Sequence, residues 1–150
     1  MSRARVLDMA PDLMMGDVVA SFFFEDQRPL SGSAALLDWR LNGALTRLLL
    51  DGEVTGNPGE YILIGNNGKL QASWVLFAGG GCRSQLAPFT YAGLIGGLLD
   101  HCRRAGFHRI SLCLTAPENG GEGWVRELAE ELAGVSRKEE IFLTIRETTG

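Results

Sequence analysis

The most constraining feature of this sequence is the segment from Asp17 to Phe24, in which apolar residues follow one another almost without interruption. Strands that face solvent on one side alternate polar and apolar residues. A continuous apolar run is instead typical of a strand covered by helices on both faces. The segment is also much too short to cross a membrane. It therefore predicts a central strand of an α/β sheet.

Strand and helix patterns alternate around this segment. Apolar runs and alternating patterns predict strands at residues 4–9, 17–24, 60–65, 71–78, 109–114 and 141–145. Apolar spacing of three or four residues predicts helices at 31–52, from Ser84 to Gly106, and from about Trp124 to Gly134. Asn66-Asn67-Gly68 between two apolar runs predicts a hairpin. The order predicts a three-layer α/β/α sandwich with a mixed sheet, in a single domain spanning 1–150.

Glycine is abundant, with 20 in 150 residues, which is about twice average usage. Most of these glycines fall in predicted turns and at predicted helix ends. Gly93, Gly96 and Gly97 instead lie inside the helix predicted from Ser84, where glycine is unfavourable. We expect them to allow close approach of that helix to the sheet.

Charge and cysteine usage exclude several classes of function. A net charge of −4 counts against non-specific binding to nucleic acid or to an anionic membrane. The N-terminal charges are not followed by an apolar signal segment. The three cysteines are an odd number and widely spaced, which is typical of reduced thiols. We expect a cytoplasmic protein with no nucleic-acid or membrane partner and no resident cofactor.

The segment Gly79-Gly80-Gly81-Cys82 follows a predicted strand and precedes a predicted helix. Backbone N–H groups in such a turn can bind a phosphate. However, the sequence has no P-loop motif, and Ser84 replaces the last glycine of a dinucleotide-binding motif. A tight strand-to-helix turn is the alternative that we favour. For Cys82, an incidental thiol in a turn is likewise favoured over a nucleophile of lowered pKa.

The remaining titratable residues predict no catalytic or metal site. His101 and His108 have no second ligand three or four residues away, so helix capping or simple exposure explains them better than metal binding. Cys102 and Cys113 fall on apolar faces and are predicted core residues.

Asp38 and Trp39 stand inside the first predicted helix and are not required by its amphipathic pattern. They indicate a specific packing or hydrogen-bonding feature, although core packing alone would also explain them.

At these residues the sequence resembles a known family. The run from Leu36 to Leu45, with Asp38-Trp39-Arg40-Leu41-Asn42-Gly43 at its centre, resembles the N-terminal domain of the leucyl (cytosol) aminopeptidase family. Three flanking segments add to the resemblance: residues 17–19, 56–60 and 75–79. Their order and spacing match the family over about residues 15–114.

The resemblance implies a fold similar to macro domains, the modules known for binding ADP-ribose. It does not imply peptidase activity, because the family's metals and catalytic residues belong to a separate C-terminal domain. A motif like Asn-Thr-Asp-Ala-Glu-Gly-Arg marks that domain, and nothing comparable occurs here. We therefore expect no room for the metallopeptidase half in these 150 residues.

Three functional hypotheses follow. The first is a stand-alone non-catalytic module acting in protein interaction or assembly, with a catalytic aminopeptidase domain or a second copy as partner. The second is macro-type binding of ADP-ribose or a related nucleotide by loops 25–33, 79–83 and 115–123. The third is an enzyme, such as a truncated peptidase or an ADP-ribose hydrolase.

The second hypothesis assigns ligand-binding residues. They are Gly32, Ser33, Gly79, Gly80, Gly81, Cys82, Thr115, Asn119, Gly120 and Gly121. Glu25 and Asp26 count against it, because two carboxylates beside a diphosphate are unfavourable.

Overall fold

The computed structural model describes residues 4–116, 122–134 and 138–147, which contain one six-stranded sheet in the order β1-β6-β5-β2-β4-β3. The strands are β1 (Ala4–Val6), β2 (Val18–Phe23), β3 (Tyr61–Gly65), β4 (Trp74–Gly79), β5 (Arg109–Ala116) and β6 (Glu140–Glu147). Neighbouring strands are parallel except β3, which is antiparallel to β4. The predicted mixed sheet is confirmed.

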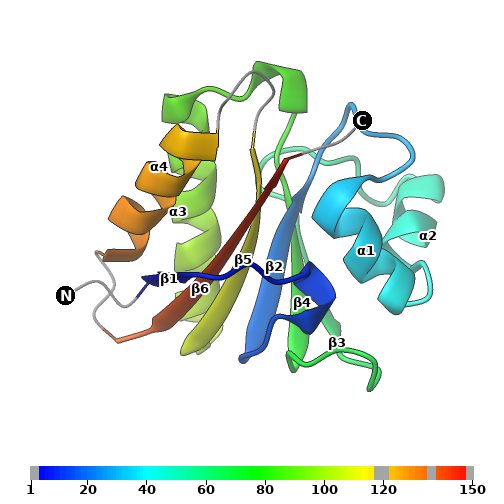
Figure 1. The fold of residues 1–150 in the computed structure, drawn as a ribbon. Helices are drawn as coiled ribbons and strands as arrows, with labels where there is room; N and C mark the ends of the chain where they lie inside the picture. Colours follow the sequence, from blue (N-terminus) through cyan, green and yellow to red (C-terminus); the bar gives the residue numbers. More distant parts are fainter. Residues whose placement is uncertain (1–3, 117–121, 135–137, 148–150) are drawn as a thin grey trace.

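Helices cover both faces of this sheet. The α-helices are α1 (Gly32–Arg40), α2 (Ala44–Leu50), α3 (Pro88–Arg104) and α4 (Glu122–Gly134), and two short 3-10 helices are η1 (Pro11–Leu13) and η2 (Arg83–Gln85). Helices α3 and α4 lie against one face, and α1 and α2 lie against the other (Figure 1). The predicted three-layer α/β/α sandwich is therefore confirmed. No helix in the described ranges is long and apolar enough to cross a membrane.

Strand β2 lies inside the sheet, between β4 and β5, and all six of its residues are buried. Val18, Ala20 and Phe22 join the core beneath α3 and α4. Val19 and Phe23 join the core beneath α1 and α2. Alternate side chains thus enter two different apolar layers, which explains the continuous apolar run.

The helix predicted over 31–52 is in fact two helices. Helix α1 ends at Arg40 and α2 begins at Ala44. Between them, Asn42 and Gly43 adopt left-handed backbone conformations, with φ of 58° and 75°. The apolar spacing continues through the break, so periodicity alone could not reveal it.

Three predicted boundaries are also wrong. The helix predicted from Ser84 begins at Pro88, after η2, since proline without an N–H fits the first helical turn. Strand β1 ends at Val6 rather than at residue 9. The predicted β3–β4 hairpin is confirmed as an antiparallel pair, but its connection spans residues 66–73. The side chain of Asn66 organises this loop by accepting hydrogen bonds from the backbone of Gly68 and Leu70.

The prediction for the glycines of α3 is wrong at two positions. A Cβ at Gly93 or Gly96 would meet nothing within 4 Å, so neither allows close packing against the sheet. Only Gly97 lies near a strand, where a Cβ would stand 3.2 Å from the hydroxyl of Tyr61. Closer contacts occur at glycines outside α3, such as Gly79, where a Cβ would overlap the carbonyl oxygen of Asn57.

Candidate functional site

The loops predicted to bind a ligand follow β2, β4 and β5. These three strands are parallel neighbours, so the loops meet at the carboxyl ends of the strands. The structure brings two of them into direct contact. The backbone N–H of Glu25 donates to Gly81 at 2.9 Å, and the Cys82 thiol lies 3.5 Å from the Glu25 carboxylate. Of the third loop, Thr115 is described, whereas Asn119, Gly120 and Gly121 lie outside the described residues.

The backbone N–H groups of the triglycine turn all donate to other backbone groups of the chain. Their acceptors are Glu60 for Gly79 (2.8 Å), Phe23 for Gly80 (2.9 Å) and Gly56 for Gly81 (2.8 Å). A Cβ at Gly80 would overlap the ring of Phe24, and Gly81 has φ of 74°. Close packing and a left-handed turn therefore account for these glycines without a ligand.

The next two N–H groups bind a carboxylate of the protein itself. Asp26 accepts hydrogen bonds from the backbone of Arg83 at 2.8 Å and of Ser84 at 3.1 Å. Desolvation raises the pKa of Asp26, but these backbone hydrogen bonds outweigh it and hold that pKa below its usual value. An external anion at this turn would have to displace the Asp26 carboxylate.

The segment from Thr55 to Glu60 packs over the ends of β2 and β4. The Glu60 carboxylate accepts hydrogen bonds from the backbone of Thr55 at 3.0 Å and of Gly56 at 2.7 Å. A Cβ at Gly56 would lie 2.8 Å from the backbone nitrogen of Glu25. The guanidinium of Arg28 donates to the carbonyl of Thr55 at 2.8 Å. Residues 56–60 of this segment also contribute to the resemblance to the aminopeptidase family. The segment therefore covers part of the carboxyl ends of the strands, where a ligand was predicted to bind.

Cys82 does not have the environment of an activated thiol. The hydrogen bond to Glu25 raises its pKa, and desolvation and the nearby negative charges act in the same direction. Cys102 and Cys113 are buried, which confirms their prediction as core residues. Burial raises the pKa of Cys102 to about 12.

The other predicted ligand residues lie on the first turn of α1 and at the end of β5. Gly32 has φ of 62°, and Ser33 is buried in α1. The backbone of Thr115 is held by Tyr91, whose hydroxyl donates to its carbonyl at 3.0 Å and accepts from its N–H at 3.1 Å. Burial raises the pKa of Tyr91, so it remains protonated. The structure thus places backbone atoms of Thr115 in an internal contact.

A second candidate site lies on the opposite side of the molecule from α3, at the turn between α1 and α2. The carboxylate of Asp38 is buried and accepts hydrogen bonds from the backbone of Leu45 at 2.7 Å and from the hydroxyl of Thr46 at 2.5 Å. It therefore caps the N-terminus of α2 although it belongs to α1. The predicted hydrogen-bonding role is confirmed for Asp38.

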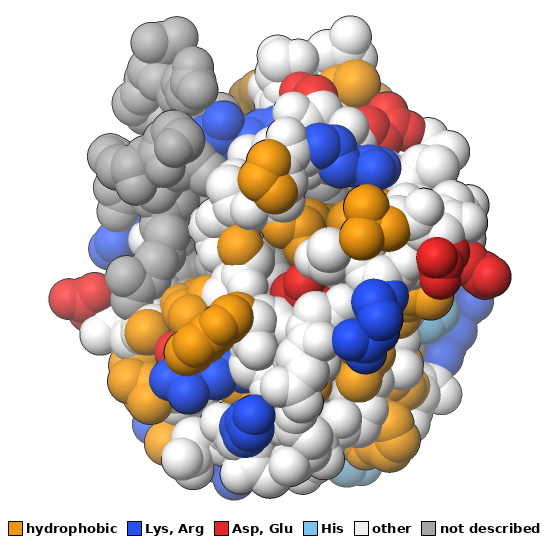
Figure 2. Space-filling view, turned by 90° about the vertical axis from the view of Figure 1, so that its right-hand side faces the viewer, with side chains coloured by type: hydrophobic (Ala, Val, Ile, Leu, Met, Phe, Trp, Pro, Cys, Tyr) orange, Lys and Arg blue, Asp and Glu red, His pale blue; other side chains and the backbone are white. Residues whose placement is uncertain are grey.

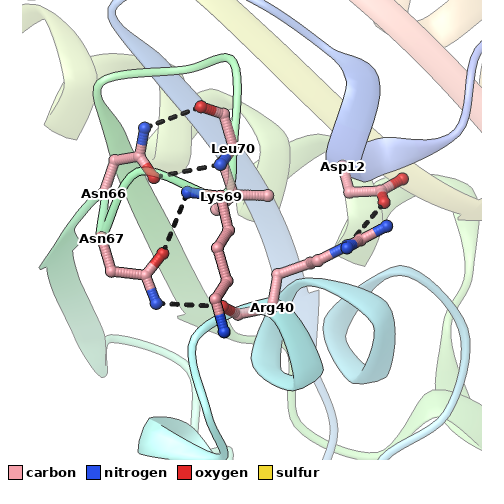
Figure 3. Close-up of polar contacts among 6 residues, drawn as sticks. All are labelled: Asp12, Arg40, Asn66, Asn67, Lys69 and Leu70. Carbon is pink, nitrogen blue, oxygen red and sulfur yellow. Dashed lines mark hydrogen bonds and ion pairs between the residues drawn. The ribbon is translucent and has the colours of Figure 1, made fainter.

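The rest of this turn is fixed by further polar contacts. Gly43 donates its N–H to the carbonyl of Asp38 at 2.9 Å. The Arg40 guanidinium pairs with Asp12 at 2.9 Å, and the side chain of Asn67 donates to the Arg40 carbonyl at 3.1 Å (Figure 3). The end of α1 is thereby joined to η1 and to the β3–β4 loop.

Trp39 has no comparable structural role. It is 68% exposed, so the interpretation of Trp39 as a core residue is wrong. The guanidinium of Arg40 lies 4.9 Å from its ring. Beside it is a surface hollow of about 640 Å³, lined by Pro29, Leu30, Ala35, Trp39, Thr46 and Arg47 among others. Figure 2, which faces this side, shows hydrophobic and basic side chains next to one another. We call this surface the Trp39 face.

In the described ranges, no group of three or more His, Cys, Asp or Glu residues is arranged to hold a metal ion. His101 instead stacks on Tyr61, with ring centroids 4.0 Å apart. The sequence offered no signal for this pair, which lies on separate elements.

Comparison with known proteins finds a family that this chain matches and one curated member of it. The model of the cytosol aminopeptidase family, N-terminal domain, matches residues 18–136. A probable cytosol aminopeptidase of Cyanothece sp. (strain PCC 7425 / ATCC 29141) is 49% identical over 45 residues, which cover 30% of this chain and 9% of that relative. The chain thus matches a small part of that protein's length.

Solved structures extend the comparison to the fold. A mutant of tomato leucine aminopeptidase aligns with a TM-score of 0.68 and 18% identity, over 98% of this chain and 32% of the tomato chain. The macrodomain of Thermus aquaticus DarG aligns with a TM-score of 0.71 and 12% identity, over 94% and 97% of the two chains. The macrodomain of Mycobacterium tuberculosis DarG aligns with a TM-score of 0.69 and 12% identity, over 98% of each chain. These similarities establish that the chain has a macro-domain-like fold, and sequence identities this low show the fold alone.

Proposed function

The chain belongs to the cytosol aminopeptidase family, as its N-terminal domain, and from this premise we propose that it is a non-catalytic module that acts by contact with another protein. The partner that we propose is a catalytic domain of the same family. The chain aligns with only 32% of the tomato enzyme, so the activity of the whole enzyme is not assigned to it.

The single observation that carries this proposal is the exposure of Trp39. The neighbouring residues Asp38 and Gly43 are accounted for by the α1–α2 turn, whereas Trp39 contributes nothing to the core. Tryptophan and arginine are the residue types that most often dominate the energy of protein interfaces. Trp39 and Arg47 line the same surface hollow together with Pro29, Leu30 and Ala35, which suits a protein surface that offers apolar groups and an acidic group for Arg47.

Binding to an isolated catalytic domain of a cytosol aminopeptidase tests the proposal. Calorimetric titration is expected to give saturable binding that Trp39→Ser weakens at least about 30-fold, as for an interface hot spot. Phe89→Ser is the matched control, because Phe89 is 93% exposed at the start of α3, which covers the other face of the sheet. Absence of binding, or equal effects of the two substitutions, would overturn the proposal.

A second candidate function is macro-type binding of ADP-ribose or a related nucleotide. It is supported by the fold likeness to macrodomains and by the position of loops 25–33 and 79–83 at the carboxyl ends of parallel strands. The internal partners of the triglycine N–H groups and the Asp26 carboxylate count against it. Thermal unfolding with millimolar ADP-ribose separates the two functions, since a bound ligand raises Tm with its concentration. We expect no rise.

A further inference from the structure

Strand β3 forms one edge of the described sheet, and its outer side has no neighbouring strand among the described residues. Edge strands usually carry a charge, a proline or a bulge that discourages pairing with another molecule. The five residues from Tyr61 to Gly65 contain none of these. This edge is therefore chemically open to a further strand.

The register with β4 determines which backbone groups face outward. Gly79 donates to Glu60, and Asn66 donates to Ser73, so even-numbered residues of this segment are bonded to β4. Because bonding alternates along an antiparallel pair, the N–H and C=O groups of Tyr61, Leu63 and Gly65 point away from the sheet.

We propose that this edge pairs with the same edge of a second copy of the chain, antiparallel and with Leu63 at the two-fold axis. In this register Leu63 faces Leu63 of the second copy, and Tyr61 faces Gly65. These are the residues with outward-facing backbone groups, and residues directly opposite can exchange both N–H···O=C bonds. The strand is thus complementary to itself, as a two-fold interface requires.

Side chains on one face of the sheet support the same register. Leu63 is 44% exposed and Trp74, opposite Gly65, is 41% exposed. The Trp74 ring lies over Gly65, 3.6 Å from the position of a Cβ, so glycine leaves the ring free to extend across the edge. In the proposed pair Trp74 extends across Gly65 toward the backbone of Tyr61 of the second copy, whose ring is held against His101 and Gly97 of α3. An apolar seam would then cross the two-fold axis.

Charges at the ends of the seam are compatible with pairing. Glu60 would face Asn66 of the second copy rather than another carboxylate. The Glu60 carboxylate accepts from the backbone of Thr55 and Gly56, and the Lys69 ammonium donates to Asn42, so neither charge has to change partner on pairing. Leu63 is on the opposite face of the sheet from Trp39, so this interface leaves the Trp39 face open, and neither proposal depends on the other.

Light scattering during size-exclusion chromatography tests the interface, over micromolar to sub-millimolar concentrations at about 0.15 M salt. The molar mass is expected to rise toward that of two chains. Leu63→Lys and Leu63→Glu each place like charges at the two-fold axis, so each alone should weaken self-association at least about tenfold. Mixed together they should restore the mass of a pair, because lysine then faces glutamate. Phe89→Lys is the control and should pair like the unchanged chain.

Circular dichroism establishes that each variant is folded, which is expected because Leu63 is partly exposed. A mass of one chain at every concentration would overturn the proposal. So would undiminished pairing of Leu63→Lys alone. A mixture of the lysine and glutamate variants that stays at the mass of one chain would also overturn it, because it would exclude the two-fold contact at Leu63.

Discussion

Replacing Asp38 by alanine should destabilise the protein far more than its distance from the sheet suggests. The substitution removes the carboxylate that caps α2 from the preceding helix. Loss of an N-cap costs about 1–2 kcal/mol. The capped N–H is that of Leu45, which is buried, and leaving such a group without a partner costs about 1–3 kcal/mol, so the loss lies at the upper end of the capping range or somewhat above it. The Thr46 side chain is exposed, and its hydroxyl can turn to water without further loss.

We therefore expect Asp38→Ala to lower the free energy of unfolding by about 2–3 kcal/mol. For a chain of this length that corresponds to a fall in Tm of about 5–10 °C. Urea unfolding followed by circular dichroism measures the change, and the slope with urea should not alter.

Two matched variants separate capping from other causes. Asp38→Asn retains an oxygen that can accept from Leu45 and an amide that can donate to Thr46, so it should lose less than about 1 kcal/mol. Thr46→Ala removes only the hydroxyl contact and should lose about 0.5–1 kcal/mol. A loss for Asp38→Ala no larger than that of an ordinary surface substitution, about 0.5 kcal/mol, would refute the capping role of Asp38. Equal losses for the asparagine and alanine variants would refute it too.

Three further predictions concern other parts of the fold. Gly79→Ala should lower the free energy of unfolding by about 3 kcal/mol or more, because the new Cβ overlaps the backbone of Asn57. Gly93→Ala should raise the free energy of unfolding by about 0.5–1 kcal/mol, and urea unfolding measures both changes. Hydrogen bonds from the backbone of Arg109 and His108 lower the pKa of Asp17. The contribution of the Asp17 carboxylate to stability is therefore fully present above about pH 4 and is lost as the pH falls through the lowered pKa. The difference in unfolding free energy between the unchanged chain and Asp17→Asn should accordingly shrink in acid, and a constant difference would contradict this. Glu25→Gln should speed alkylation of Cys82 by iodoacetamide several-fold, because it replaces the ionised hydrogen-bond acceptor that raises the thiol pKa with a neutral one. Mass spectrometry measures the rate, and an unchanged rate would disagree.

The sequence was sufficient to predict the architecture because its strongest signals are local. The apolar run of β2 and the alternation of Ile110, Leu112 and Leu114 report directly on which layers cover each strand. The same periodicity failed at the α1–α2 break, since Leu41, Ala44 and Leu45 keep their apolar spacing across a left-handed turn. That break depends on the Asp38 carboxylate reaching forward seven residues, a contact that no periodic pattern encodes.

The candidate ligand loops illustrate a different limit of sequence analysis. A run of glycines between a strand and a helix has the same appearance whether it binds a phosphate or packs against backbone. The deciding groups are Asn57, Glu60 and Asp26, which come from two other loops. Likewise, the sequence drew attention to Trp39, but only the structure distinguishes an exposed ring from a buried one.

Hydrogen exchange of the chain with and without an isolated cytosol aminopeptidase catalytic domain tests the central claim most directly. The proposal predicts slower exchange across residues 35–47, on the Trp39 face, and unchanged exchange at 79–85. Slower exchange at 25–33 and 79–85 with no change at 35–47 would contradict it, as would identical exchange throughout.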